Sequence, residues 1–163
     1  MTTTAEPGIS TAIRPATPED AAALAALRWE FRAALGQVNE ERDAFVARCG
    51  AWMRARLGDG GAWRAWVAEA GGEIVGTVWV EMVEKMPNPV DEPEVHGYLT
   101  NFYVRDALRG GGLGGRLLAA ALGACAAAGV HTVFLWPTQR SRPLYRRFGF
   151  VGEGEVMLRS MRV

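Results

Sequence analysis

The stretch that decides the fold is Asn101–Leu118, which reads NFYVRDALRGGGLGGRLL. An apolar, strand-like run gives way to a short turn, five glycines and a leucine-rich helix that continues to Ala128 and ends at Gly129. Glycine lets the main chain approach a ligand closely, and the free N–H groups and dipole at a helix start attract anions. The segment therefore predicts a phosphate-binding loop, to which Arg109 and Arg116 can add charge-assisted bonds.

Other interpretations of these glycines are less favoured. A Walker A loop is excluded because no lysine and hydroxyl residue follow them. The dinucleotide fingerprint G-x-G-x-x-G matches Gly110, Gly112 and Gly115, but it also requires an acid about 20 residues later. After Asp106 the next acid is Glu153. A purely structural role at the start of the helix is disfavoured, because each glycine lowers helix stability by about 1 kcal/mol relative to alanine.

Periodicity outside this stretch predicts alternating strands and helices in the order β-α-α-β-β-β-α-β-α-β. Helices are expected after two candidate N-caps, Thr17 and Asn39, then after the glycines, and over Ser141–Phe148. The expected strands are Ile9–Arg14, Trp63–Ala70, Ile74–Val83, Val95–Val104, His131–Trp136 and Val156–Met161. A mixed sheet with helices on both faces follows from this order. Gly71-Gly72 predicts a tight hairpin between two of the strands.

Length and composition indicate one folded domain. Of the 163 residues, 49% are hydrophobic and 22% charged, which is typical of globular proteins and excludes a disordered chain. We expect a flexible tail at residues 1–8 and a single domain at residues 9–163. No run of 18 apolar residues predicts a membrane span, and the tail lacks the pattern of a signal peptide. Cys49 and Cys125 are expected to be buried free thiols, and the expected location is the cytoplasm.

The zero net charge conceals an uneven distribution. Residues 1–100 carry 9 basic and 15 acidic side chains, whereas residues 101–163 carry 9 basic and 3 acidic ones. A basic half predicts an anionic partner, either a phosphorylated cofactor or a nucleic acid. Nucleic acid is not expected, because the arginines bracket a glycine loop rather than line one helix face. No metal site is expected either, since neither cysteine has a metal-ligand spacing.

Several motifs together resemble the GNAT superfamily, the Gcn5-related N-acetyltransferases. Arg109–Gly114 (RGGGLG) is similar to the R/Q-x-x-G-x-G/A motif of that family. The segments YLTNFYV before it, RLL after it and Pro143–Phe150 (PLYRRFGF) also resemble the family, and the order of elements matches over Ile9–Val163. The resemblance implies the acyl-CoA N-acyltransferase fold, an α/β (α+β) protein. Its mixed, mostly antiparallel sheet has six to seven strands, with helices on both faces.

Acetyl-CoA is the cosubstrate that the resemblance implies, with its pyrophosphate on the main-chain amides of the glycine loop. The strand ending at Val104 is expected to splay from His131–Trp136, so that pantetheine bonds to the open main chain of Phe102 and Val104 like an extra strand. Thr138 stands where many members have an asparagine that bonds pantetheine, and its hydroxyl can make part of that contact. Ser141 is expected to cap the short helix. The expected cofactor-binding residues are Phe102, Tyr103, Val104, Arg109, Gly110, Gly111, Gly112, Leu113, Gly114, Gly115, Arg116, Thr138, Ser141 and Tyr145.

The implied activity is transfer of an acetyl group from acetyl-CoA to a primary amine, by direct attack in a ternary complex. The acetyl carbonyl is expected near Thr100–Asn101, where a bulge frees an N–H to polarise it. Tyr145, in the Tyr-Arg-Arg-Phe-Gly-Phe context, is the expected general acid for the departing thiolate. A catalytically silent acyl-CoA-binding sensor on the same fold is the alternative.

The general base has three candidates, Glu94, His96 and Glu81, and an ordered water chain is a fourth possibility. Strand alternation places Glu94 and His96 on one face with the residues that precede the bulge. His96 has the ordinary pKa closest to neutrality. His131 begins a buried strand and is expected to be structural.

A small-molecule or peptide amine is the expected partner, and homodimers are common in the family. The acceptor wall is expected on the first two helices and the loop after Val83, where aromatic and acidic side chains suit a cationic amine. Its residues are Trp29, Phe31, Asn39, Glu40, Glu84, Asp91 and Glu92. Trp63, Trp66 and Trp79 lie on strands and are expected in the core.

Overall fold

A single mixed sheet organises the protein. The computed structural model describes residues 8–161, and these form six strands in the spatial order β1-β2-β3-β4-β5-β6. The strands are β1 (Thr11–Pro15), β2 (Trp63–Ala70), β3 (Glu73–Glu84), β4 (Val95–Val104), β5 (Thr132–Leu135) and β6 (Met157–Ser160). Only β4 and β5 pair in parallel, so the mixed, mostly antiparallel sheet that the sequence predicts is confirmed.

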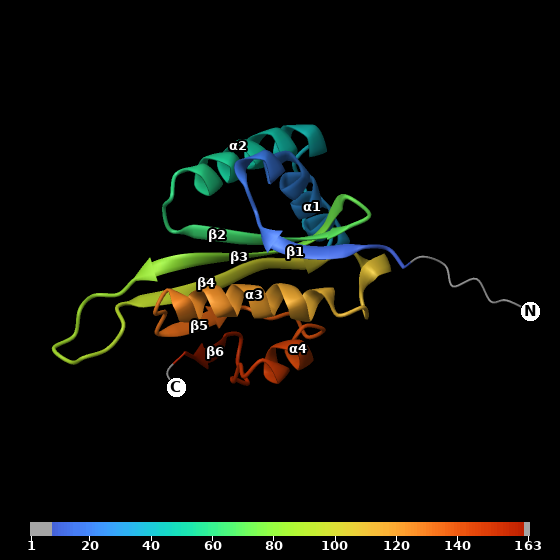
Figure 1. Ribbon diagram of the computed structural model, residues 1–163. Coiled ribbons are helices and arrows are strands. Elements are labelled where there is room, and N and C mark those ends of the chain that lie inside the picture. The colour runs from blue at the N-terminus through green and yellow to red at the C-terminus, as the bar shows by residue number, and fades with distance from the viewer. Residues whose placement is uncertain (1–7, 162–163) are drawn as a thin grey trace, which may run out of the picture.

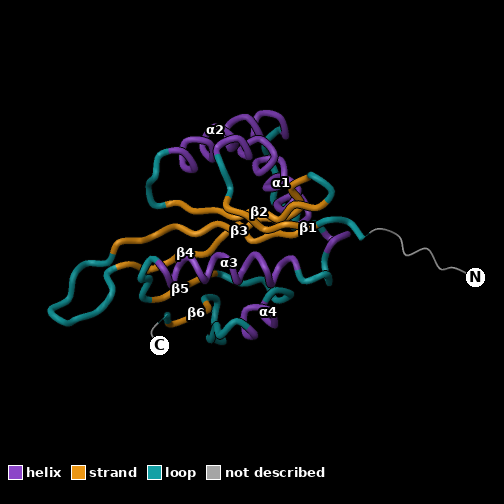
Figure 2. The backbone as a smooth tube through the Cα atoms, in the orientation of Figure 1, coloured by secondary structure: helices purple, strands orange, loops and turns teal. Residues whose placement is uncertain are grey.

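Helices cover both faces of the sheet (Figure 1). The helices α1 (Ala21–Ala34) and α2 (Arg42–Gly58) lie on one face, and α3 (Leu113–Ala127) and α4 (Arg142–Arg147) on the other. Two short 3-10 helices, η1 (Pro18–Asp20) and η2 (Asp106–Leu108), precede α1 and α3. Figure 2 shows the strands as a layer between the two helical layers, with the proline-containing β3–β4 loop projecting from one end.

Each face of the sheet has its own hydrophobic core. Leucines of α3 at spacings of four and five, among them Leu113, Leu117 and Leu122, pack with Leu99, Val133 and other inward residues of the strands. On the other face, Leu24 of α1 and Met53 of α2 pack against alternate residues of β2 and β3, including Trp79. The sheet therefore separates two cores, and each core fixes a different pair of helices.

The hairpin between β2 and β3 turns on Gly71-Gly72, as the sequence predicts. Both glycines have positive φ angles, 57° and 83°. A two-residue turn with positive φ at both positions matches the twist of the flanking strands, and glycine adopts it without steric cost. The two strands then pair from Trp63↔Glu81 to Ala70↔Glu73.

The start of α2 differs from the prediction. The helix begins at Arg42, and its N-cap is Glu41, whose side chain accepts a hydrogen bond from the N–H of Ala44 at 2.9 Å. Asn39 is not the cap, because the carboxylate of Glu41 reaches the first free amides of the helix. The element order is otherwise as predicted, with ends shifted by a few residues. Apart from Gly8, the predicted tail lies outside the described residues.

The first helical segment is held by a buried carboxylate. Asp20 is 8% exposed and accepts hydrogen bonds from the guanidinium of Arg14 at 2.8 and 2.9 Å and from the N–H of Thr17 at 2.8 Å. Arg14 also donates to Glu69 on β2. The hydrogen bonds from Arg14 lower the pKa of Asp20. The Arg14 guanidinium lies between the carboxylates of Asp20 and Glu69 and so joins β1, η1 and β2.

No described helix is long and apolar enough to cross a membrane.

Asp20→Asn is expected to lower the free energy of unfolding by about 1–2 kcal/mol at neutral pH, because it removes a charge-assisted pair. The folded-state pKa of Asp20 is lowered, so its contribution is present above the ordinary pKa of about 3.9 and is lost as the pH falls through the folded value. Urea unfolding at several pH values measures this difference. The exposed neighbour is the control, and Glu19→Gln should change stability by less than about 0.5 kcal/mol.

Candidate active site

The start of α3 forms a cradle of main-chain donors. Its N-cap, Gly112, has φ 84°, and the first bond of the helix runs from the Arg116 N–H to the Gly112 carbonyl at 3.1 Å. The amides from Gly112 to Gly115 therefore have no acceptor within the helix. A Cβ placed on Gly110 or Gly112 would meet no atom within 4 Å, so the loop borders open space. This geometry suits an anion held by N–H groups and the helix dipole.

A cleft opens where β4 and β5 part. The two strands pair only from His96↔Thr132 to Tyr98↔Phe134, while β4 continues to Val104. Beyond this point lies a cleft of about 760 Å³ between β4, the glycine loop, α1 and α4. The predicted splay is therefore present. Of the residues predicted to bind the cofactor, all but Gly111 and Arg116 line the cleft.

A bulge marks the middle of the cleft wall. The pairing of β3 with β4 shifts between Thr77↔Tyr103 and Trp79↔Thr100, which places one extra residue on β4. Asn101 lies in this shift with φ 51°, and no other described residue except glycine has a positive φ. Its side-chain oxygen accepts a hydrogen bond from Arg28 of α1 at 3.2 Å. The predicted bulge is present, and an arginine that the sequence did not single out holds it.

Tyr145 lines the cleft from α4. The residue is 5% exposed, and its ring contacts those of Phe102 on β4 and Phe150 after α4, with centroids 5.9 and 5.5 Å away. Burial raises the pKa of the phenol, and a hydrogen bond with Ser141 lowers it only in part. The hydroxyl therefore stays protonated through the neutral range, as a proton donor requires.

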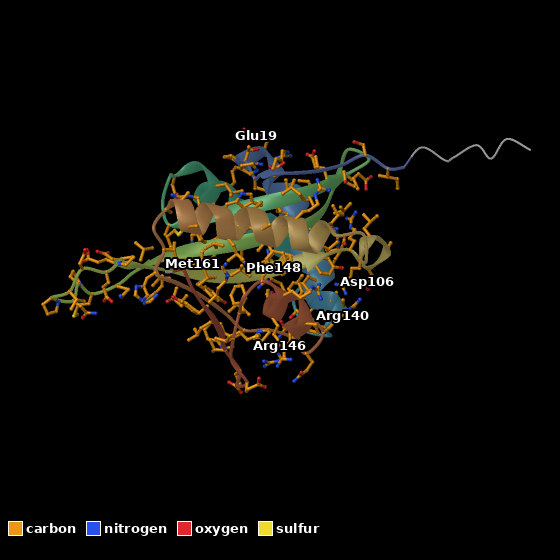
Figure 3. The ribbon with its side chains drawn as sticks, turned by 60° about the horizontal axis from the view of Figure 1, so that its bottom comes forward. Glu19, Asp106, Arg140, Arg146, Phe148 and Met161 are labelled. Carbon is orange, nitrogen blue, oxygen red and sulfur yellow. The ribbon has the colours of Figure 1, made fainter. Side chains whose placement is uncertain are left out.

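The arginines beside the glycine loop bond to the protein itself. Arg109 donates to the Val104 carbonyl at 2.8 Å and pairs with Asp106 at 2.7 Å, while Arg116 donates to Thr11 at 2.9 Å. Arg140 and Arg147, which the sequence did not single out, also line the cleft, as do Arg28 and Arg32 of α1. Figure 3 shows Arg140 beside Asp106 near the start of α3, and their charged atoms lie 3.7 Å apart.

Thr138 and Ser141 both line the cleft and bond to each other. The hydroxyl of Ser141 accepts a bond from the Thr138 N–H at 3.0 Å and lies 3.0 Å from the Thr138 hydroxyl. Ser141 occupies the N-cap position of α4 as predicted, but its side chain makes no capping bond to the helix. The two hydroxyls instead close the turn that leads into α4.

A second cavity of about 460 Å³ lies on the face covered by α1 and α2. It shares four lining residues with the cleft, namely Arg28, Tyr98, Thr100 and Asn101. Its other lining residues are Phe45, Arg48, Cys49, Trp52, Met53, Trp63 and Trp79. The two spaces therefore meet at the bulge.

The first two helices line the second cavity, but mostly through residues other than those predicted for the acceptor wall. Of the seven side chains proposed for it, only Phe31 lines either space. The acids of the β3–β4 loop lie elsewhere, and Glu92 there bonds to Lys85 and Asn88. Trp66 and Trp79 are in the core as expected, and Trp63 is half-buried against it. Trp63 and Trp79 also line the second cavity. Cys125 is buried as expected, but Cys49 is only half-buried and also lines that cavity.

The three candidate bases differ in distance from the bulge. Glu81 pairs with Trp63 on one side and Tyr98 on the other, so it shares a sheet face with two residues of the second cavity. His96 lies on β4 two residues further from the bulge than Tyr98. Its ring packs edge-on against His131, and its Nδ1 has no hydrogen-bond partner among residues 8–161. Glu94 precedes β4 and is exposed. None of the three lines either space, and Glu81 lies nearest to the bulge.

Comparison with known families decides the identity of the fold. The family model described as the Acetyltransferase (GNAT) family matches residues 23–150, which span the first helix, the glycine loop and α4. The chain belongs to the GNAT acetyltransferase family. A search of curated proteins found no match to the chain.

Solved acetyltransferase structures share the same architecture. A predicted acetyltransferase from Clostridium acetobutylicum, crystallised with acetyl-CoA, has a TM-score of 0.75 and 21% identity, over 90% of this chain and 93% of its own. A GCN5-related N-acetyltransferase from Ralstonia eutropha has a TM-score of 0.69 and 26% identity, over 90% and 95%. The PaiA N-acetyltransferase from Thermoplasma acidophilum, in complex with coenzyme A, has a TM-score of 0.67 and 17% identity, over 93% and 99%. The predicted fold is thus confirmed.

Gly112→Ala is expected to raise the Kd for coenzyme A at least tenfold. An alanine at φ 84° is strained by about 1–2 kcal/mol, and relief of that strain would turn the free amides away from an anion. Isothermal titration calorimetry with coenzyme A measures the change.

Gly123 provides the control within the same helix. It is exposed, has no positive φ, and its added Cβ would meet no atom within 4 Å. Gly123→Ala should leave the Kd unchanged and stabilise α3 by about 0.5–1 kcal/mol. Equal affinities for the two variants would mean that the glycine loop does not hold the diphosphate.

Proposed function

We propose that this protein is an N-acetyltransferase that moves the acetyl group of acetyl-CoA to the primary amine of a small molecule, by direct attack in a ternary complex. One observation carries the proposal, namely that the cleft and the second cavity meet at the bulge of β4, through four shared lining residues. Two substrates that occupy the two spaces would therefore meet at Asn101. The GNAT neighbours crystallised with acetyl-CoA or coenzyme A support the choice of cosubstrate.

The residues of the cleft fit acetyl-CoA. Main-chain amides of the glycine loop would hold the diphosphate, with Arg140 and Arg147 adding positive charge. The edge of β4 that β5 leaves unpaired would hold the pantetheine. When bound, acetyl-CoA supplies a thioester carbonyl for attack and a thiolate as leaving group.

Two groups of the chain would act on the reacting atoms. The main chain at the Asn101 bulge would donate to the carbonyl oxygen as negative charge develops on it. Tyr145 would give its proton to the sulfur, and its raised pKa keeps that proton in place at neutral pH. The alternative of a silent acyl-CoA sensor gains no support from a cleft in which a tyrosine hydroxyl is kept protonated beside a second cavity.

Tyr145→Phe is expected to lower kcat by about 100-fold, because a positioned general acid contributes roughly that much. The ring contacts with Phe102 and Phe150 remain, so the Kd for coenzyme A should change by less than about twofold. Free-thiol detection of the released coenzyme A gives kcat, and calorimetry gives the Kd. A variant with unchanged kcat would remove Tyr145 from the mechanism.

The pH profile provides a second check on the same residue. Burial raises the pKa of Tyr145 above the ordinary value of about 10, so its ionisation should produce no alkaline fall in kcat between pH 7 and about 9. An alkaline limb in that range which disappears in Tyr145→Phe would contradict this assignment.

Glu81 is proposed as the group that receives the proton of the amine. Its register between Trp63 and Tyr98 places it on the face of the second cavity, one strand from the bulge. Glu81→Gln is expected to lower kcat/KM for the amine by about 10- to 100-fold at neutral pH, with coenzyme A affinity unchanged. Glu84→Gln, at the exposed end of the same strand, is the matched control. Activity of Glu81→Gln within about twofold of the parent would point to water as the base.

A further inference from the structure

The second cavity holds a positive charge with no carboxylate beside it. Among its lining residues are two arginines and no acid. Arg48 is already neutralised by two hydrogen bonds to Glu40, at 2.6 and 3.2 Å. Arg28 is half-buried and forms no ion pair within residues 8–161, and the bond to the Asn101 amide oxygen leaves most of its donors unused.

Burial of an unpaired positive charge lowers the stability of the protein unless an anion binds to it. Desolvation lowers the pKa of Arg28, and the nearby charge of Arg32 lowers it further. A guanidinium nevertheless stays protonated, because its ordinary pKa lies far above neutrality. An unpaired buried cation costs stability, whereas a planar anion such as a carboxylate would match its donors in pairs.

Apart from Thr100 and Asn101 at the bulge, the remaining wall is mostly apolar and aromatic. The rings of Trp52, Trp63 and Trp79 lie together, with centroid distances of 5.2, 6.1 and 6.2 Å. Phe45 and Met53 complete the lining around them. A space of about 460 Å³ enclosed in this way suits a large apolar or aromatic side chain.

The position of Arg28 limits the distance between the carboxylate and the amine of an acceptor bound in the second cavity. Arg28 contacts Asn101 itself, the bulge residue at which the reacting carbonyl would lie. A carboxylate held by Arg28 must therefore be close in the acceptor to the attacking nitrogen. In an α-amino acid only one carbon separates the amine from the carboxyl group, and the side chain leaves from that same carbon.

We propose that the acceptor is an α-amino acid with a bulky apolar or aromatic side chain, whose carboxylate is bound by Arg28 and whose side chain lies among the three tryptophans. This inference rests on the proposed N-acetyltransferase function and names its substrate class. The amine nitrogen forms a bond to the acetyl carbon while the carbon–sulfur bond breaks. The sulfur takes the proton of Tyr145, and the nitrogen releases its extra proton to Glu81 or water. The products are an N-acetylamino acid and coenzyme A.

Three amines that share one ring test the carboxylate in the unaltered protein. L-Phenylalanine carries the carboxylate, L-phenylalaninamide replaces it with a neutral amide, and phenethylamine lacks it. With acetyl-CoA as donor, kcat/KM for phenylalanine should exceed that for the other two by at least tenfold. Equal rates, or faster acetylation of the two analogues that lack the carboxylate, would overturn the inference and leave the N-acetyltransferase function intact.

Variants of Arg28 test whether this residue recognises the carboxylate. Arg28→Gln should reduce the preference for phenylalanine over phenylalaninamide to within about threefold of unity, and this ratio is the readout because loss of the bond to Asn101 slows both substrates alike. Arg28→Lys keeps the charge without the paired donors and should retain part of the preference. Arg54→Gln, an exposed arginine of α2 that lines neither space, is the control and should keep the full preference.

The other possible results also test the inference. If Arg28→Gln slows both substrates equally, Arg28 only positions Asn101 and the inference is wrong. If the variant does not fold, the comparison of substrates in the unaltered protein decides alone. Binding of acetyl-CoA in calorimetry without acetylation of any of the three amines overturns the inference, whereas no binding of acetyl-CoA overturns the proposed function itself.

Discussion

The separation of β4 from β5 is the constraint on which the site depends. The two strands share a short parallel ladder that ends at Tyr98↔Phe134. Beyond this point β4 continues to Val104 without β5 on that edge. Parallel pairing requires a crossover, and α3 supplies it on one face of the sheet, so that its N-terminus lies beside the widening gap. The open edge of β4, the free amides of the glycine loop and the hydroxyl of Tyr145 therefore border one space. The bulge at Asn101 lies along the same edge.

Features with a local signal were predictable from the sequence. The Gly71-Gly72 turn, the Thr17 helix start and the glycine loop each depend on residues within a few positions of one another, and the periodicity of α3 is equally local. The bulge near Asn101 was expected from the family resemblance, and the register of β3 against β4 shows it. Strand alternation also predicted that His96 shares a face of β4 with Tyr98, but alternation contains no information about the distance of His96 from the bulge.

Features that depend on distant partners were not predictable. Arg28 and Asn101 are 73 positions apart, so no spacing rule relates them. Arg109 and Arg116 were expected to face an anion, yet their guanidinium groups bond to Val104, Asp106 and Thr11, because acceptors of the chain lie within reach. The acceptor wall was placed on two helices and a loop by the family resemblance, and a resemblance at the level of elements does not show which side chains enter a cavity.

The two separate hydrophobic cores have a consequence for how such a protein changes over time. The cofactor-side elements are packed in the core that contains Leu117 and Tyr145, whereas the walls of the second cavity belong to, or border, the core around Leu24 and Trp79. Substitutions at well-separated sites without shared partners have nearly additive effects. Mutations in the second cavity, away from the four residues that it shares with the cleft, can therefore accumulate in evolution or in directed selection with little effect on the cleft beside the glycine loop.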